Sequence, residues 1–331
     1  MSTLAAVVLF VGVTAYAVLG GADYGAGFWD LTAGGARRGA EPRHLVDQAL
    51  APVWEANHVW LIFCLVMLWT AFPPAFAAIM TTLYIPLGLA ALGIVVRGSG
   101  FAFRKVLVRT DQQRAAGAAF AASSVITPFF LGSVAGGIAS GRVPTGGHGD
   151  PITGWVNPTS LLGGLLAVGV TAFVAAVFLT AEARLRSDDG IERRFRRRAQ
   201  GSAIGTGAVA LAGIAVLHAD AGRLFTGLTT RALPLVLISA LCGLASLFLL
   251  HRAAPRLLQA LAVSAAGTVV VGWGVAQYPY LLGTHLRIGA AAAPDATLAA
   301  LTVVAAFALL LVVPAVALLF VLQQRGHLDS A

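Results

Sequence analysis

The chain has 331 residues, of which 58% are hydrophobic and only 11% are charged. Soluble domains carry about 25% charged residues, so this composition excludes an ordinary soluble protein and indicates one embedded in a membrane. The net charge of +8 alone would suit a nucleic-acid-binding protein. The basic residues, however, are confined to gaps between long apolar segments, which argues against that class and predicts no nucleic-acid partner.

About nine long apolar runs follow one another along the chain. A spanning helix needs about 20 apolar residues, and the alternating pattern of a barrel strand is missing. We therefore predict an all-α integral membrane protein with about nine transmembrane helices. The predicted spans are 3–33, 53–72, 76–96, 115–140, 159–183, 201–219, 232–250, 257–278 and 297–322. We expect a single polytopic membrane domain (1–331) with two four-helix bundles, roughly 1–140 and 155–278, and one peripheral helix at 297–322.

The first run is long and is interrupted by small and polar residues, including Gly21, Asp23 and Gly25. It lacks a basic leading region and a cleavage pattern, so we expect a mature helix and not a signal peptide. Glycines four residues apart permit close helix contact. This spacing occurs at Gly21/Gly25, Gly132/Gly136 and Gly201/Gly205. We expect Gly21 and Gly25, together with Trp54 and Trp60 of the second run, to pack against a partner subunit.

Two of the 14 acidic residues, Asp23 and Glu55, lie inside apolar runs and not in gaps. A charge in hydrocarbon costs about 2.5–3.5 kcal/mol, so such residues usually face protein or a water-filled cavity. A buried carboxyl that binds and releases a proton near neutral pH is what a proton relay requires. His58 follows Glu55 by one turn and shares its face. We predict that Asp23, Glu55 and His58 form a proton pathway; alternatively, each acid is held structurally by an arginine or by backbone groups.

His58 is the one histidine expected inside a span, so the chain offers no mid-span histidine pair for a haem. Cys64 and Cys242 both fall mid-span, and neither belongs to a metal-binding pair. We therefore expect no disulfide, no metal site and no cofactor bound by this chain.

Most of the 22 basic residues fall in alternate gaps between the predicted spans. By the positive-inside rule those gaps and the C-terminus are cytoplasmic, and the N-terminus is outside. The largest basic group, Arg193–Arg198, is expected to lie against anionic lipid headgroups, on a short surface helix within 184–200. The basic residues on the other side are Arg142, Arg223, Arg231 and Arg287. The loop 141–158 on that side is rich in Gly and Pro and is expected to be irregular.

Two segments near the N-terminus carry a family pattern. Residues 21–27 read GADYGAG and contain D-x-G-x-G, and residues 51–61 read APVWEANHVWL and contain P-x-W-E-x-N-x-V-W. Together they resemble subunit II of the cytochrome bd family of quinol oxidases. Weaker similarities at 96–104, Asn157-Pro158 and 278–280 extend the resemblance over most of the chain. The chain departs from many members in having Glu55 in place of Asp, and from some in having Gly20 in place of an acid.

The resemblance implies a haem-free subunit of a quinol:oxygen oxidoreductase in the bacterial cytoplasmic membrane. Its partner would be the haem-bearing subunit I, whose haems b and d pass electrons from quinol (menaquinol or ubiquinol) to O2. Protons taken from the cytoplasm would make the reaction electrogenic without a pump, and Asp23 and Glu55 match acidic positions of the family's proton route. A small single-helix accessory subunit, membrane lipids and a structural quinone are further partners that the resemblance leaves open.

Two other classes of function are compatible with an apolar chain that carries buried acids. A proton-coupled secondary transporter would have broken helices at matching positions of its two halves. The first predicted span is broken, but no matching break occurs in the second half. In a non-catalytic membrane scaffold, Asp23 and Glu55 would be structural only. Copurification with a haem-rich partner would distinguish the oxidase subunit from both alternatives.

Overall fold

The computed structural model describes residues 1–34, 39–106 and 110–324. The side chains of 40, 47–56, 104–106, 110–111, 313, 316–317 and 319–324 lie outside that description. The helices are α1 (Ser2–Leu31), α2 (Ala40–Ala71), α3 (Pro73–Thr82), α4 (Tyr84–Val106), α5 (Thr110–Ala139), α6 (Pro158–Leu185), α7 (Asp189–Asp220), α8 (Gly222–Thr229), α9 (Leu233–Leu249), α10 (Pro255–Gln277), α11 (Ile288–Ala291) and α12 (Asp295–Gln324). Strands β1 (Tyr280–Leu282) and β2 (Leu286–Arg287) form a small antiparallel sheet.

Within the described residues, seven helices are long and apolar enough to cross a membrane. The number rises to nine if two bent pairs each form one span. One pair joins the apolar end of α2 to α3 at a bend of 117°, and the other joins α8 to α9 at a bend of 76°. The prediction of an all-α membrane protein with about nine spans is therefore confirmed.

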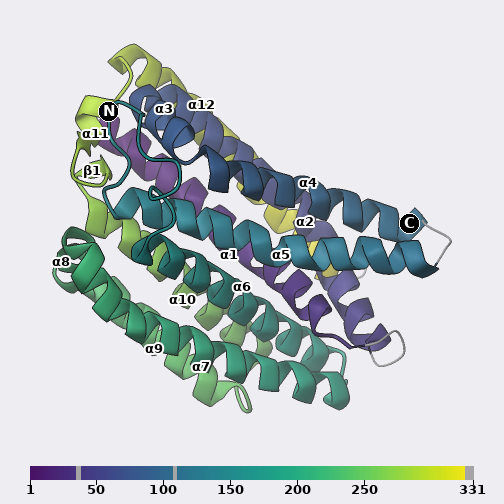
Figure 1. Ribbon diagram of the computed structural model, residues 1–331. Helices are drawn as coiled ribbons and strands as arrows, with labels where there is room; N and C mark the ends of the chain where they lie inside the picture. The colour runs from purple at the N-terminus through teal and green to yellow at the C-terminus, as the bar shows by residue number, and fades with distance from the viewer. Residues whose placement is uncertain (35–38, 107–109, 325–331) are drawn as a thin grey trace.

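The spanning helices form two groups of four that meet at α1, a member of the first group (Figure 1). Helices α2, α4 and α5 accompany α1 in the first group, and α6, α7, α9 and α10 form the second. Helix α1 also packs on α6 and α10, and α12 lies against α1 and α2. This arrangement agrees with the expected two four-helix bundles and one peripheral helix, and it makes α1 the central element.

Proline and capping residues mark where several helices begin. A proline occupies the first turn of α3, α6, α9 and α10, where no intrahelical partner for its missing N–H is needed. Asn157 caps α6, since its Oδ1 accepts a hydrogen bond of 2.9 Å from the backbone N–H of Ser160. Asp188 caps α7 in the same way through the N–H of Ile191, also at 2.9 Å.

Two of the three glycine pairs lie where helices approach closely. A Cβ added to Gly25 would overlap the backbone carbonyl of Thr171 on α6. One added to Gly132 would overlap the carbonyl of Gly163, and one added to Gly136 would lie 2.5 Å from the Cα of Ser160, both also on α6. The third pair, Gly201/Gly205, has no neighbouring atom within 4 Å of such a Cβ, so it mediates no helix contact in this chain.

Two details of the predicted layout are wrong. The third span, predicted at 76–96, is interrupted at Leu83, and its helix continues to Val106. The surface helix expected within 184–200 is the beginning of α7, which starts at Asp189. In both cases polar residues lowered the local hydropathy without ending the helix, because a helix can continue beyond the apolar part of the bilayer.

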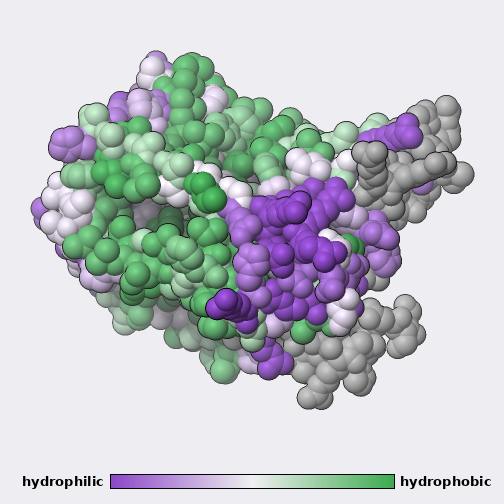
Figure 2. All heavy atoms as spheres, turned by 90° about the horizontal axis from the view of Figure 1, so that it is seen from below, coloured by the Kyte–Doolittle hydropathy of each residue, from purple (hydrophilic) through white to green (hydrophobic). Residues whose placement is uncertain are grey.

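The two ends of the molecule differ in charge. Arginines of the last turn of α6, the first turns of α7 and the α9–α10 connection gather at the end where α1 finishes, which we term the arginine-rich end. Figure 2 shows this hydrophilic area on a face that is otherwise mostly apolar. Exposed large apolar side chains follow α7 and α9, as expected for helices that face lipid.

Candidate functional site

The Asp23 carboxylate lies at the centre of a buried polar cluster. Asp23 is on α1 and is only 1% exposed, and its Oδ1 forms an ion pair with the Arg97 guanidinium from α4. Arg97 Nη2 also donates a 3.1 Å hydrogen bond to the backbone carbonyl of Asp23, and Nη1 donates to Ser124 Oγ on α5. The cluster therefore ties together three helices of the first bundle.

Arg97 itself is only 1% exposed. Its guanidinium carbon lies 4.9 Å from the centre of the Tyr24 ring and 4.5 Å from that of Phe120. A lone buried charge would be very costly, and here the opposite charge of Asp23 and the two aromatic faces offset that cost. Arg97 was assigned from the sequence to the polar gap after the third span; that assignment is wrong because α4 carries it into the bundle.

Glycines one turn to either side of Asp23 make room for its neighbours. A Cβ on Gly20 would lie 2.7 Å from the side-chain nitrogen of Asn57, a residue of α2 that is 1% exposed. A Cβ on Gly27 would lie 2.9 Å from Nη1 of Arg97. Gly20, Asp23 and Gly27 share one face of α1, so this face is polar and is closely covered by side chains of α2 and α4.

Several buried atoms of this cluster have no hydrogen-bond partner in the described part of the chain. They are Asp23 Oδ2, Asn57 Oδ1, Arg97 Nε and Thr127 Oγ1. Buried polar atoms in proteins are nearly always satisfied, and those without a protein partner are usually satisfied by ordered water. The chemistry of the cluster therefore fits internal water between α1, α2, α4 and α5.

The other predicted members of the proton pathway lie on α2. His58 is half-buried and within electrostatic range of Asp23. The side chain of Glu55, like that of Trp54, lies outside the described residues. The structure thus surrounds this part of α1 with Arg97 and Asn57, which were not predicted as site residues, and leaves His58 within electrostatic range of Asp23. The signal for Asn57 was present in the sequence, because it stands inside the P-x-W-E-x-N-x-V-W motif.

The residues expected to pack against a partner subunit contact their own chain. Gly25 lies against the backbone of α6, and a Cβ on Gly21 would be in ordinary contact, at 4.0 Å, with Thr171 and Val174. Trp60 is 7% exposed and packs edge-on against Phe63. Gly25 therefore meets α6 of its own chain, and Trp60 meets Phe63 of its own helix. Packing of Gly21, Gly25, Trp54 and Trp60 against a partner subunit stays a prediction.

The arginine-rich end holds a second set of buried polar contacts around the end of α1. Asp30 is 5% exposed and accepts a hydrogen bond of 2.7 Å from Arg43 Nε on α2. From α7, Arg194 donates to the carbonyl of Ala33, and Arg198 donates to that of Thr32 at 2.7 Å. Cations near the C-terminal carbonyls of a helix stabilise it. Part of the Arg193–Arg198 group thus faces protein and not lipid.

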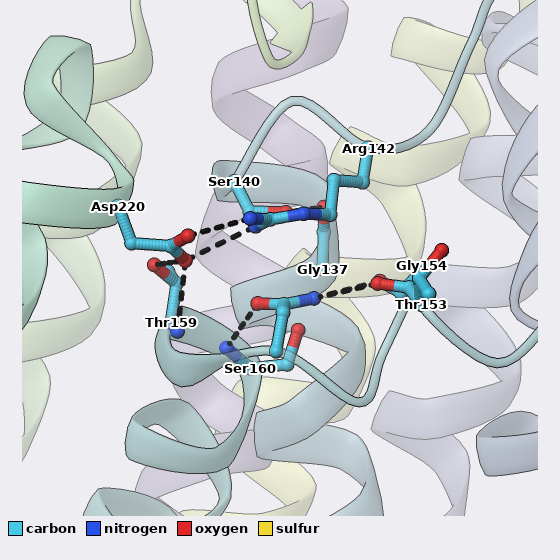
Figure 3. Close-up of polar contacts among 9 residues, drawn as sticks. Gly137, Ser140, Arg142, Thr153, Gly154, Thr159, Ser160 and Asp220 are labelled. Carbon is cyan, nitrogen blue, oxygen red and sulfur yellow. Dashed lines mark hydrogen bonds and ion pairs between the residues drawn. The ribbon is translucent and has the colours of Figure 1, made fainter.

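At the opposite end, Arg142 and Asp220 form a two-pronged ion pair, with N–O distances of 3.0 and 2.5 Å (Figure 3). Thr159 at the start of α6 donates to the same carboxylate through its hydroxyl at 2.6 Å and its backbone N–H at 3.2 Å. The hydrogen bond to Asp220 raises the pKa of Arg142 above its ordinary value. This contact fastens the irregular loop after α5, predicted at 141–158, to the ends of α6 and α7.

The described residues form neither a three-ligand metal site nor a facing pair of histidines for a haem. No group of three His, Cys, Asp or Glu side chains is close enough to hold a metal ion in this part of the chain. Apart from His58, the histidines there lie near helix ends or in connections; His218 packs on Phe225, and His251 contacts Gln200. His58 therefore has no facing histidine with which to share a haem iron in the described part. Cys64 and Cys242 are free thiols.

Comparison with protein-family models matches residues 1–323 to the cytochrome bd terminal oxidase subunit II model. Among curated proteins, the chain is 28% identical over 238 residues to cytochrome bd ubiquinol oxidase subunit 2 of Bacillus subtilis (strain 168), covering 71% of this chain and 67% of that protein. It is 28% identical over 222 residues to cytochrome bd-I ubiquinol oxidase subunit 2 of Escherichia coli (strain K12), covering 63% of this chain and 56% of that protein.

Comparison with solved structures matches the chain to the structure of bd oxidase from Geobacillus thermodenitrificans. The TM-score is 0.76 at 24% sequence identity, and the match covers 96% of this chain and 98% of the other. At this identity the likeness shows a shared fold. It extends over both bundles and the peripheral helix, since nearly the whole of each chain takes part.

Proposed function

The chain belongs to the cytochrome bd terminal oxidase subunit II family, and from this we propose that it is the haem-free subunit of a bd-type quinol oxidase. Its partner would be the haem-bearing subunit I, whose haems b and d carry electrons from menaquinol or ubiquinol to O2. The observation that carries the proposal is the family match over residues 1–323.

We propose further that this chain contributes to the route by which protons reach the oxygen site. Three features support Asp23, Glu55 and His58 as members of that route. Asp23 is buried among polar groups of α2, α4 and α5, and His58 is in electrostatic range of it. The atoms without a protein partner around Asp23 fit internal water, which can conduct protons between side chains. Glu55 precedes His58 by one helical turn.

Because Asp23 is paired with Arg97, we propose a role for it that differs from the roles of Glu55 and His58. Its Oδ1 is held by Arg97, so only Oδ2, which has no partner in the described part, is available to water. Asp23 would act as a fixed counter-charge that orders water, while Glu55 and His58 would bind and release protons. The net reaction would consume protons from the arginine-rich side and generate a proton-motive force without pumping.

The same proposal includes the domain organisation of the chain, its orientation in the membrane and its further partners. We place it as a single membrane domain, with bundles roughly at 1–140 and 155–278 and a peripheral helix at 297–322. Its N-terminus would be outside and its C-terminus in the cytoplasm of a bacterium, which the arginine-rich end supports. A small accessory subunit, lipids and a structural quinone would be further partners of the complex. The alternative of a proton-coupled secondary transporter gains no support from the comparisons.

The test is to purify the tagged chain in mild detergent and record a reduced-minus-oxidised absorption spectrum. We expect bands of b- and d-type haem, held by a second polypeptide that elutes with the tagged chain. A preparation that contains the intact chain alone and no haem would contradict the proposal and restore the transporter or scaffold alternatives.

A further inference from the structure

The arginines at the arginine-rich end fall into two groups according to what they contact. Arg184, Arg194, Arg196 and Arg198 all bond to carbonyls or carboxylates of their own chain. Arg193, Arg197, Arg252 and Arg256 are exposed, and none of them has a hydrogen bond or ion pair within the described part of the chain. The second group, which we term the outward arginines, therefore carries four positive charges that have no ion-pair partner in the described part of the chain.

The outward arginines of α7 lie beside the α9–α10 connection. Arg193 and Arg197 are four residues apart on α7 and so are neighbours on its surface. One turn further on, the Gln200 side chain contacts Nε2 of His251 at 3.2 Å. This contact brings the connection that carries Arg252 against α7. Figure 2 shows hydrophilic residues gathered at this end of the face formed by α7 and α9.

The length of α7 places its arginines at the depth of lipid headgroups. Its 32 residues span about 48 Å, whereas the hydrocarbon core is about 30 Å thick and is crossed by about 20 residues. Counted back from Asp220, the hydrocarbon segment ends near residue 200. The headgroup layer adds roughly 5–8 Å on each side. Arg197 begins about 4.5 Å beyond residue 200 and falls within this layer. Arg193 begins about 10 Å beyond residue 200, and its long side chain reaches back toward the headgroups.

The surface below the outward arginines is apolar. Ile204 on α7 is 62% exposed, and Phe248 near the end of α9 is 75% exposed. Side chains of this kind contact acyl chains, while a guanidinium pairs with phosphate through two parallel hydrogen bonds. A ligand that matches both surfaces has an anionic phosphate head and apolar tails.

We infer that Arg193, Arg197, Arg252 and Arg256 form a binding site for the headgroup of an anionic phospholipid, whose acyl chains lie along α7 and α9. The ligand must carry a net negative charge, because four uncompensated cations gain little from a zwitterionic headgroup. Arg194 and Arg198 are excluded from the site, since they are engaged by α1. Lipid binding here does not depend on the oxidase activity proposed above.

The site is tested on the purified complex, delipidated and then titrated with phosphatidylglycerol or phosphatidylcholine, with bound lipid counted by native mass spectrometry. Each arginine near an anionic surface contributes about fivefold, so Arg193→Gln with Arg197→Gln should weaken phosphatidylglycerol binding about 30-fold. Arg252→Gln with Arg256→Gln, on a different element, should act in the same direction. The matched control, Arg223→Gln with Arg287→Gln, removes two exposed charges from the opposite end and should leave this binding unchanged.

Three results would overturn the inference. They are unchanged phosphatidylglycerol binding in both outward-arginine variants, an equal loss in the control variant, and binding of inorganic phosphate as tight as that of phosphatidylglycerol. The last would show a site for soluble anions. Loss of a copurifying protein with lipid binding intact would instead identify a protein contact. The haem spectrum of each preparation tests the oxidase proposal separately.

Discussion

At the scale of single residues, the Asp23–Arg97 pair changes how the acid on α1 is interpreted. Two opposite charges, each 1% exposed, face one another between α1 and α4. The sequence alone allowed either a proton carrier or an acid held by an arginine. The structure shows that an arginine holds one carboxylate oxygen, which leaves Glu55 as the stronger candidate for proton binding and release.

Glu55→Gln keeps the size of the side chain but cannot exchange a proton. We expect O2 reduction by the purified complex to slow by about tenfold or more, while the haem spectrum stays largely unchanged. The control is Glu182→Gln, which alters an acid paired with Arg186 at the protein surface and should have no such effect. Full turnover in Glu55→Gln would exclude Glu55 from the pathway.

Asp23→Asn is expected both to slow O2 reduction and to destabilise the chain. Removing one partner leaves Arg97 buried without a counter-charge, which costs about 3–5 kcal/mol. The double variant with Arg97→Gln removes both charges, so it should regain much of the thermal stability but not the turnover. Thermal unfolding and oxygen consumption of the purified complexes separate the two effects. An Asp23→Asn variant as stable as the unaltered protein would show that the ion pair does not matter for folding.

At the scale of elements, α1 is the helix that most of the other spanning helices surround. It packs on α2, α5, α6, α10 and α12, and glycines stand where neighbours come closest. Helices in lipid gain little from apolar burial against one another, so close backbone approach and interhelical hydrogen bonds carry their association. The Trp29 indole, which donates to the carbonyl of Ala172 at 2.8 Å, is one such bond between α1 and α6.

Gly25→Leu should prevent α1 from packing on α6, because any side chain at this position overlaps the backbone of Thr171. Overpacking of this kind typically costs about 1–3 kcal/mol and more where backbone must move. We expect a sharp loss of monodisperse complex on size-exclusion chromatography. Gly243→Leu on α9, where a Cβ would meet no atom within 4 Å, is the matched control. Equal yields of the two variants would mean that α1 and α6 can separate without penalty.

At the scale of the whole molecule, charge divides the chain into two unlike ends. At the arginine-rich end, Arg194 and Arg198 of α7 donate hydrogen bonds to carbonyls just after α1. At the opposite end, the Arg142–Asp220 ion pair links the loop after α5 to the end of α7. The polar face of Gly20, Asp23 and Gly27 runs toward the arginine-rich end. A proton route through this chain would therefore open on the side that the positive-inside rule assigns to the cytoplasm.

Reporter fusions test that orientation. Green fluorescent protein joined to the C-terminus should fluoresce in bacterial cells, since it folds in the cytoplasm. Alkaline phosphatase at the same position should be inactive, because it needs the oxidising compartment outside. Active phosphatase and a dark fluorescent protein would reverse the proposed topology and place the arginine-rich end outside.

The sequence by itself determined the class of the protein, its family and the number of spans. Those properties depend on hydropathy and on two local motifs, which a linear chain displays directly. It also identified Asp23 as an acid buried in a span. It could not identify Arg97 as its counter-ion, because the two residues are far apart in the chain and hydropathy placed Arg97 in a gap.

Only the tertiary structure decided how the polar and small residues are used. Glycine spacing alone did not distinguish Gly25, which meets α6, from Gly201, which meets nothing. Consecutive basic residues likewise did not reveal that Arg194 and Arg198 bond to α1 while Arg193 and Arg197 face outward. Which face of a helix is enclosed depends on neighbours brought together by the fold. Composition and spacing along one chain do not contain that information.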